Sequence, residues 1–197
     1  AMAETKLSRG GQKLASAELG GPDDPWKCVW GKERPLRHSA GKKLSAWDAK
    51  QGGVGVLARK PMPAQGVQDP LPMEDTPGLP SNIYDEGRYH HVAFALGTGA
   101  QAGHCLVYYG WTGARQGAQP AKERNEHSIT QVFNQGAALG DVPVIIAADF
   151  NDTEETSHAL AVVLQSGDWH DAAVVIANRN GTTPDPTFVR VGQQPSR

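Results

Sequence analysis

The sequence predicts an α/β layered sandwich in a single domain, and three observations support this fold class. Segments with strand character are interspersed with segments of helical periodicity, which favours sheets flanked by helices. The apolar segments 91–96 and 104–109 are joined by a glycine-bearing connection, as in a β-hairpin. With 197 residues, the chain is long enough for one domain with its own hydrophobic core.

Before this hairpin, the sequence predicts one helix, one strand and one long loop. Apolar residues recur at roughly helical spacing in residues 5–19, and a Gly-Gly-Pro sequence then stops the helix. The next segment, 23–51, is polar, with tryptophans as its expected anchors. Residues 54–59 lie between glycines and a proline, which predicts a short strand. The proline-rich residues 61–80 are expected to form an exposed loop.

After the hairpin, the sequence predicts two helices and three extended segments. Residues 126–139 carry apolar side chains at steps of three and four, which predicts an amphipathic helix. The β-branched run 144–148 suits a strand that is buried on both faces. The remaining predicted elements are a helix at 156–165, an extended stretch at 169–176 and a short strand at 186–189.

Charge and cysteine content limit the classes of partner without selecting one. Residues 1–60 contain 12 lysines and arginines against 6 aspartates and glutamates, whereas the whole chain has a net charge of −2. A basic first third can face a polyanion such as nucleic acid, or it can be ordinary solvated surface. Cys28 and Cys105 are expected to be free thiols in a reducing, intracellular compartment, and a lone disulfide is the alternative. No apolar run is long enough to span a membrane, so we expect a soluble protein without a membrane partner.

The strongest chemical signal is the sequence Asp149-Phe150-Asn151, which directly follows the predicted strand 144–148. Side chains alternate along an extended chain, so Asp149 and Asn151 point to the same side. A carboxylate there can bind a hard cation, and an amide can donate a hydrogen bond without adding charge. The alternative is an Asx turn that caps the following helix. By the same alternation, the adjacent His90 and His91 point to opposite faces and are not expected to chelate one ion together.

Residues 144–151 resemble the Gly-Asp-Phe-Asn strand end of the endonuclease/exonuclease/phosphatase superfamily, which has the deoxyribonuclease I-like fold. Further segments resemble the landmarks of that family and occur in the same order. They are Ala3-Glu4-Thr5-Lys6-Leu7 for Gln-Glu-Thr-His-Leu, residues 52–58 for the strand that follows, residues 106–111 for Asn-Val-Tyr-Gly-Pro, and residues 169–171 and 186–188 for Trp-x-Asp and Pro-Thr-Phe.

The resemblance implies two mixed β-sheets packed face to face with flanking helices, and a phosphodiester hydrolase that uses Mg²⁺ or Mn²⁺. Nucleic acid, DNA above all, is then the expected substrate. Glu4 and Asp149 are the implied metal ligands, and Asp149, Asn151 and Tyr109 are the implied catalytic residues. Mg²⁺ neutralises charge that develops on the phosphate in such reactions.

The sequence also departs from the family pattern. The family's opening strand with its asparagine and its closing Ser-Asp-His segment have no counterpart in the sequence, and Ala148 stands where the family has glycine. These departures predict an incomplete active site with weak or no turnover. The alternative is therefore a catalytically inactive, truncated domain of the same fold that acts in binding or has no function.

Overall fold

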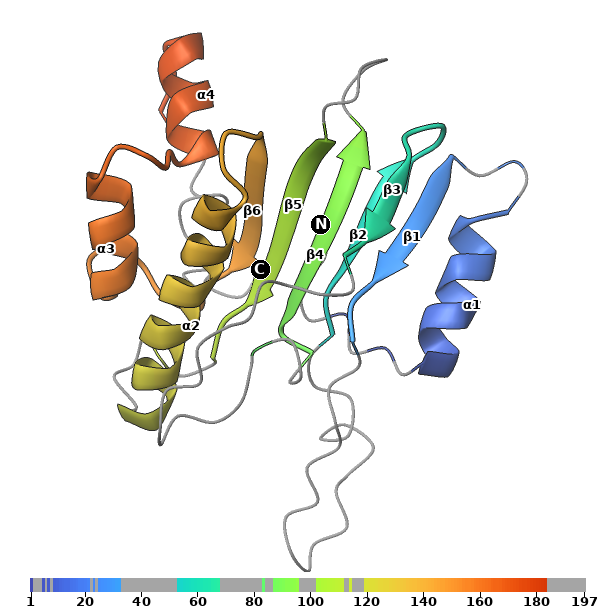
Figure 1. Cartoon of the computed structure of the whole chain (residues 1–197), viewed down its shortest axis with the longest axis horizontal. Coiled ribbons are helices and arrows are strands. Elements are labelled where there is room, and N and C mark those ends of the chain that lie inside the picture. Colours follow the sequence, from blue (N-terminus) through green and yellow to red (C-terminus); the bar gives the residue numbers. More distant parts are fainter. Residues whose placement is uncertain are drawn as a thin grey trace, which may run out of the picture. The chain divides into compact units, whose positions relative to one another are not determined.

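The computed structural model describes residues 1, 5, 7, 9–21, 23, 25–32, 53–67, 83, 87–95, 102–111, 114 and 119–183 (Figure 1). These residues form an α+β structure with two β-sheets and several helices. The chain divides into two compact units, Ala1–Tyr109 with Asn134–Ala148, and Gly110–Phe133 with Asp149–Arg197. The predicted final strand at 186–189 lies outside the described residues.

The smaller sheet of the first unit consists of β1 (Trp26–Trp30) and β2 (Gly55–Arg59), which pair antiparallel. Strand β2 confirms the predicted strand at 54–59, whereas β1 lies in the segment that was predicted only as polar. The helix predicted at 5–19 is present as α1 (Arg9–Leu19) and contacts β1. The Trp30 Nε1 donates a hydrogen bond of 2.7 Å to the Ser16 hydroxyl, which joins the two elements.

The larger sheet has the strand order β3 (Ala64–Gly66), β4 (Tyr89–Ala95), β5 (Ala102–Tyr109) and β6 (Val144–Asp149). Strands β4 and β5 form an antiparallel pair, which confirms the predicted hairpin. Strand β3 corrects the prediction of a continuous loop at 61–80, because a three-residue strand carries no periodicity that a sequence can show.

Strand β6 runs parallel to β5. The His104 N–H donates to the Pro143 carbonyl at 2.9 Å, and the Gly110 N–H donates to the Asp149 carbonyl at 2.6 Å. The two partners are equally far apart in sequence in both bonds, which is the register of parallel strands. Parallel neighbours need a crossover connection, and α2 (Gln119–Ala138) lies in it. The carboxyl ends of β5 and β6 therefore lie side by side at the same end of the strands, which is called the carboxyl edge of the sheet below.

The two sheets pack face to face through a shared apolar core in the first unit. Val54, which precedes β2, packs with Cys105 and Val107 of β5, and Ala58 of β2 packs with Val92 of β4. The two sheets and the helices are compatible with the predicted layered sandwich. The prediction that strand 144–148 is buried on both faces is wrong, because Ile145 is 57% exposed. The reason is that, among the described strands, β6 lies at the end of the sheet order.

The second unit contains the first part of α2 together with α3 (His158–Gln165) and α4 (Ala172–Asn180). Helix α3 confirms the helix predicted at 156–165, and α2 begins seven residues before the predicted start at residue 126. Helix α4 shows that the extended stretch predicted at 169–176 is wrong. The Asp171 side chain accepts from the Ala173 N–H at 2.7 Å, and Gly181 ends the helix with a φ of 64°.

Phe133 anchors the core of the second unit. Its ring stacks on Phe150 with 6.1 Å between centroids and meets the edge of Trp169 at 5.1 Å. Trp169, one of the family landmarks, therefore has a packing role in this structure. Within the described part of the chain, no helix is both long and apolar enough to cross a membrane.

Replacing Glu126 by alanine is expected to lower the free energy of unfolding by about 1 kcal/mol. The Glu126 carboxylate accepts hydrogen bonds from the His158 and Ala159 N–H groups, at 3.1 and 2.7 Å, where α3 begins. Denaturant unfolding measures the change. The control, Glu123→Ala, removes an exposed glutamate from α2, the helix that also contains Glu126. Its free energy of unfolding is expected to stay within roughly 0.5 kcal/mol of the wild-type value. Equal losses in both variants would refute the capping role.

Candidate functional site

Asp149 and Asn151 form a fixed turn at the carboxyl end of β6. Both side chains are half-buried, and the Asn151 N–H donates to the Asp149 carboxylate at 3.1 Å. Asn151 has a φ of 50°, in the left-handed region that asparagine tolerates better than most residues. The turn has the hydrogen bond of an Asx turn, which is the alternative that the sequence left open.

Gly110, the residue after β5, connects this turn to the neighbouring strand end. Its carbonyl accepts a hydrogen bond of 3.1 Å from the Asn151 side-chain amide, and its N–H donates to the Asp149 carbonyl. A Cβ at Gly110 would overlap the Phe150 carbonyl oxygen and would lie 2.8 Å from the Asn125 Oδ1. The two chain segments can approach this closely only because residue 110 has no side chain.

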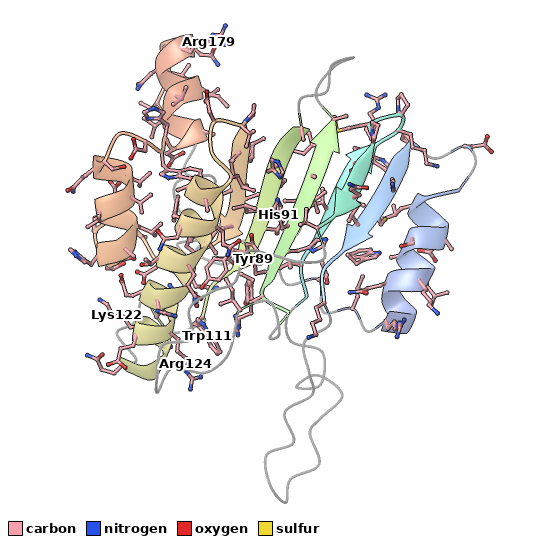
Figure 2. The ribbon with its side chains drawn as sticks, in the orientation of Figure 1. Tyr89, His91, Trp111, Lys122, Arg124 and Arg179 are labelled. Atoms are coloured by element: carbon pink, nitrogen blue, oxygen red, sulfur yellow. The ribbon has the colours of Figure 1, made fainter. Side chains whose placement is uncertain are left out.

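Asn125 of α2 is fully buried and contacts both loops at this edge. Its Oδ1 accepts from the Trp111 N–H at 3.0 Å, and its Nδ2 donates to the Phe150 carbonyl at 2.9 Å. The Trp111 ring lies under the Arg124 guanidinium, 5.0 Å from ring centroid to Cζ (Figure 2). Asn125 is not among the site residues that the sequence predicts. Its position could have indicated a buried role. Asn125 precedes Ile129 by one helical turn and therefore lies on the face of the helix that the apolar spacing assigns to the core.

Tyr109, a predicted catalytic residue, is 6% exposed and packs in the apolar core of the first unit with Val54 and Cys105. Its N–H donates to the Arg88 carbonyl at 2.8 Å, and its own carbonyl accepts from the Arg88 guanidinium at 3.1 Å. The Arg88 Cζ also lies 5.3 Å from the centre of the Tyr109 ring. Arg88, which the sequence analysis did not single out, therefore fixes both the backbone and the ring of Tyr109.

Glu4, the other predicted metal ligand, lies outside the described residues. Within the described ranges, no group of three or more histidine, cysteine, aspartate or glutamate side chains could hold a metal ion. Cys28 and Cys105 are free thiols, as expected. Burial raises the pKa of the Cys105 thiol, and the charge of the N-terminal amino group lowers it by a smaller amount.

Two buried histidines lie next to each other on β4, and they face opposite sides of the strand as predicted. The His90 ring packs against Gly66, where a Cβ would lie 3.1 Å from Cε1, and its side chain is 5% exposed. The His91 Nε2 makes a 2.8 Å hydrogen bond with the His104 Nδ1. Burial lowers the pKa of His90 to about 4. The pKa of His91 is also lowered to about 4, mainly by burial and to a smaller extent by repulsion from His104 and His90.

Comparison with models of known protein families finds no match, and no curated protein sequence matches the chain. The function must therefore be inferred from the residues of the site and their geometry.

Proposed function

We propose that this chain is a divalent-metal-dependent phosphodiester hydrolase of the endonuclease/exonuclease/phosphatase superfamily, with a deoxyribonuclease I-like fold, and that it acts on nucleic acid. The observation that carries the proposal is the Asp149–Asn151 turn, which is fixed at the shared carboxyl edge of the parallel strands β5 and β6. In sheets with parallel strands and a helical crossover, ligands bind at this edge. The face-to-face packing of two sheets agrees with the proposed fold.

The oxygen ligands of the proposed site are of the kind that Mg²⁺ and Mn²⁺ prefer. Mg²⁺ prefers hard oxygen ligands, keeps several waters and commonly takes only one or two carboxylates from the protein. Asp149 supplies a half-buried carboxylate at the sheet edge, and we assign the second carboxylate to Glu4. When bound, the ion would neutralise negative charge that develops on the phosphate oxygens.

The residues of the turn have distinct roles in this proposal. The Asp149 carboxylate orients the attacking water and accepts its proton. The Asn151 amide uses one N–H to bond the Gly110 carbonyl, and its second N–H can donate to a phosphate oxygen. Because the turn holds Asn151 in place before substrate binds, little reorganisation is needed in the transition state.

DNA is the proposed substrate because residues 1–60 carry a net positive charge, which favours a polyanion. A single experiment separates DNA from other phosphodiesters and phosphomonoesters. Plasmid DNA, a duplex with an abasic site and an inositol phosphate are incubated with the protein and Mg²⁺ under identical conditions. Cleavage of either DNA with the inositol phosphate left intact supports the assignment, and the reverse pattern refutes it.

A second candidate is a domain of the same fold that binds without catalysis. Its support is that the Asp149 carboxylate and the Asn151 amide already have partners within the turn and at Gly110. An Asx turn of this kind needs no ligand to be stable. The two candidates differ in whether the Asp149 charge has a role beyond the turn.

Asp149→Asn is expected to lower DNA hydrolysis by ~10²–10⁴-fold and to abolish the rise in melting temperature that Mg²⁺ produces in wild type. Asparagine keeps the oxygen that accepts the Asn151 N–H but loses the charge, so the melting temperature without metal should change little. Asp168→Asn alters an exposed carboxylate on the loop after α3 and should behave as wild type. Equal Mg²⁺ shifts in all three proteins, with no hydrolysis, would select the binding domain.

A further inference from the structure

We infer that Asn125 is a positioning residue of the candidate site, because its single side chain fixes the loop after β5 to the loop after β6. This inference rests on the proposed function for its catalytic consequence. The coupling of the two loops follows from contacts that all lie within the second unit.

The Asn125 side-chain amide is used at both of its ends. The oxygen accepts from the Trp111 N–H at 3.0 Å, and the nitrogen donates to the Phe150 carbonyl at 2.9 Å. The same nitrogen lies 3.4 Å from the Asp152 Oδ2. The residue is 0% exposed, so water cannot replace any of these partners without opening the structure.

The two anchored backbone groups lie next to the residues proposed to act on the phosphate. Phe150 is the central residue of the turn and lies between Asp149 and Asn151. Trp111 follows Gly110, which bonds the Asn151 side chain through its carbonyl and the Asp149 carbonyl through its N–H. A shift of either anchor would therefore move the Asp149 carboxylate relative to the Asn151 amide.

The far side of the turn is held by Asp152, which is 5% exposed. Its Oδ1 accepts hydrogen bonds from the Thr153 N–H at 3.0 Å and from the Thr156 hydroxyl. These bonds fix the carboxylate against which the Asn125 nitrogen lies. The connection therefore extends from α2 through the turn to the segment that precedes α3.

Only a side chain with a donor at one end and an acceptor at the other satisfies these partners. Aspartate has the same size and can still accept from the Trp111 N–H. It would, however, place a negative charge against the Phe150 carbonyl and the Asp152 carboxylate. Asn125→Asp is therefore the sharpest test, because it changes the donor and leaves the volume unchanged.

The experiment compares Asn125→Asp with Asn134→Asp, an exposed asparagine of the same helix. Amide hydrogen exchange is followed at Trp111 and Asn151, and kcat and KM for DNA hydrolysis are measured with Mg²⁺. In Asn125→Asp, repulsion between the new carboxylate and Asp152 is expected to push the two loops apart together, which also weakens the bond at the Trp111 N–H. We therefore expect exchange at both amides to speed up and kcat to fall, each roughly tenfold, with KM nearly unchanged. Asn134→Asp should leave all four quantities at wild-type values. If Asn125→Asp does not fold, Asn125→Ser tests the same coupling without adding charge, because its shorter side chain has one polar atom in place of the two that bond Trp111 and Phe150.

A double-mutant cycle with Asn151→Ala separates positioning from a general loss of stability. If Asn125 acts through the turn, the losses of kcat in Asn125→Asp and Asn151→Ala are less than multiplicative in the double variant. Multiplicative losses, or exchange that changes at only one of the two amides, would overturn the inference. A wild-type protein that neither binds Mg²⁺ nor cleaves DNA would overturn the proposed function instead, and the exchange data would still decide whether Asn125 couples the loops.

Discussion

Lowering the pH from 7 to 4 is expected to reduce the free energy of unfolding by up to about 3 kcal/mol for each of two histidines, His90 and His91. Both side chains are almost fully buried in β4, at 5% and 4% exposed. Among the described residues, neither ring nitrogen of His90 has a hydrogen-bond partner, so nothing stabilises a proton there. His91 is bonded to another histidine, which would repel a second positive charge.

The direction of the effect follows from the two pKa values of each side chain. In the unfolded chain, a histidine takes up a proton as the pH falls below 6.5, whereas His90 and His91 stay neutral in the fold until about pH 4. The unfolded state therefore binds more protons between these values. The contribution of these histidines to stability is complete above about pH 6.5 and is lost as the pH falls through this window to about 4.

Denaturant unfolding at several pH values measures the loss, and His90→Leu provides the internal test. Leucine fills a similar volume without buried polar atoms, so we expect stability at pH 7 to be kept and roughly half of the acid-induced loss to disappear. His170→Gln, at an exposed position, should retain the full pH dependence. A pH profile of His90→Leu that matches wild type would show that His90 does not carry the effect.

Replacing Gly110 by alanine is expected to destabilise the protein by about 3 kcal/mol and to abolish the response to Mg²⁺. The added methyl group would overlap the Phe150 carbonyl and press on the Asn125 Oδ1. The overlap can be removed only if the loop after β5 moves away from the turn, because the overlapping atoms of Phe150 belong to the backbone and not to a flexible side chain. The hydrogen bond from the Asn151 amide to the Gly110 carbonyl would be lost in that movement.

Gly140→Ala is the matched control for this substitution. Gly140 has a φ of 76°, and among the residues that the structure describes, no atom outside its immediate chain neighbourhood lies within 4 Å of an added Cβ. Its cost is therefore backbone strain alone, on the order of 1 kcal/mol. Thermal unfolding with and without Mg²⁺ compares the two variants. Similar losses of stability at both positions, or a retained Mg²⁺ response in Gly110→Ala, would show that close approach at Gly110 is unimportant.

The elements that the sequence predicted correctly are those with strong local signals. The β4–β5 hairpin, β2 and α3 have clear periodicity and glycine or proline at their boundaries. Strand β1 lies in a polar segment, and only its pairing with β2 reveals it. Helix α4 was missed because Val174, Val175 and Ile176 favour a strand by propensity. Asp171 and Gly181, which cap the two ends of this helix, are the sequence features that indicate a helix here.

Only the part of the candidate site formed by residues close together in sequence could be predicted. Asp149 and Asn151 stand beside each other in sequence, so their turn could be anticipated together with its Asx alternative. The contact of this turn with Gly110 joins segments that the whole β5–α2–β6 crossover separates, and its contact with Asn125 comes from the crossover helix α2 itself. Sequence spacing does not show which loops meet after such a crossover. The burial of Tyr109 in the core could not be predicted either, because Val54 and Arg88, which contact it, directly precede β2 and β4 and are distant from it in sequence.

The parallel pairing of β6 with β5 implies an order of assembly. The β4–β5 hairpin closes a short loop, whereas β6 can dock only after the long α2 crossover has folded back, and the entropy cost of closing a loop grows with its length. The turn with Asp149 and Asn151 should therefore be among the last parts to form. A partial opening that releases β6 would disable the proposed hydrolase while the hairpin stays intact, so activity is expected to disappear before global unfolding.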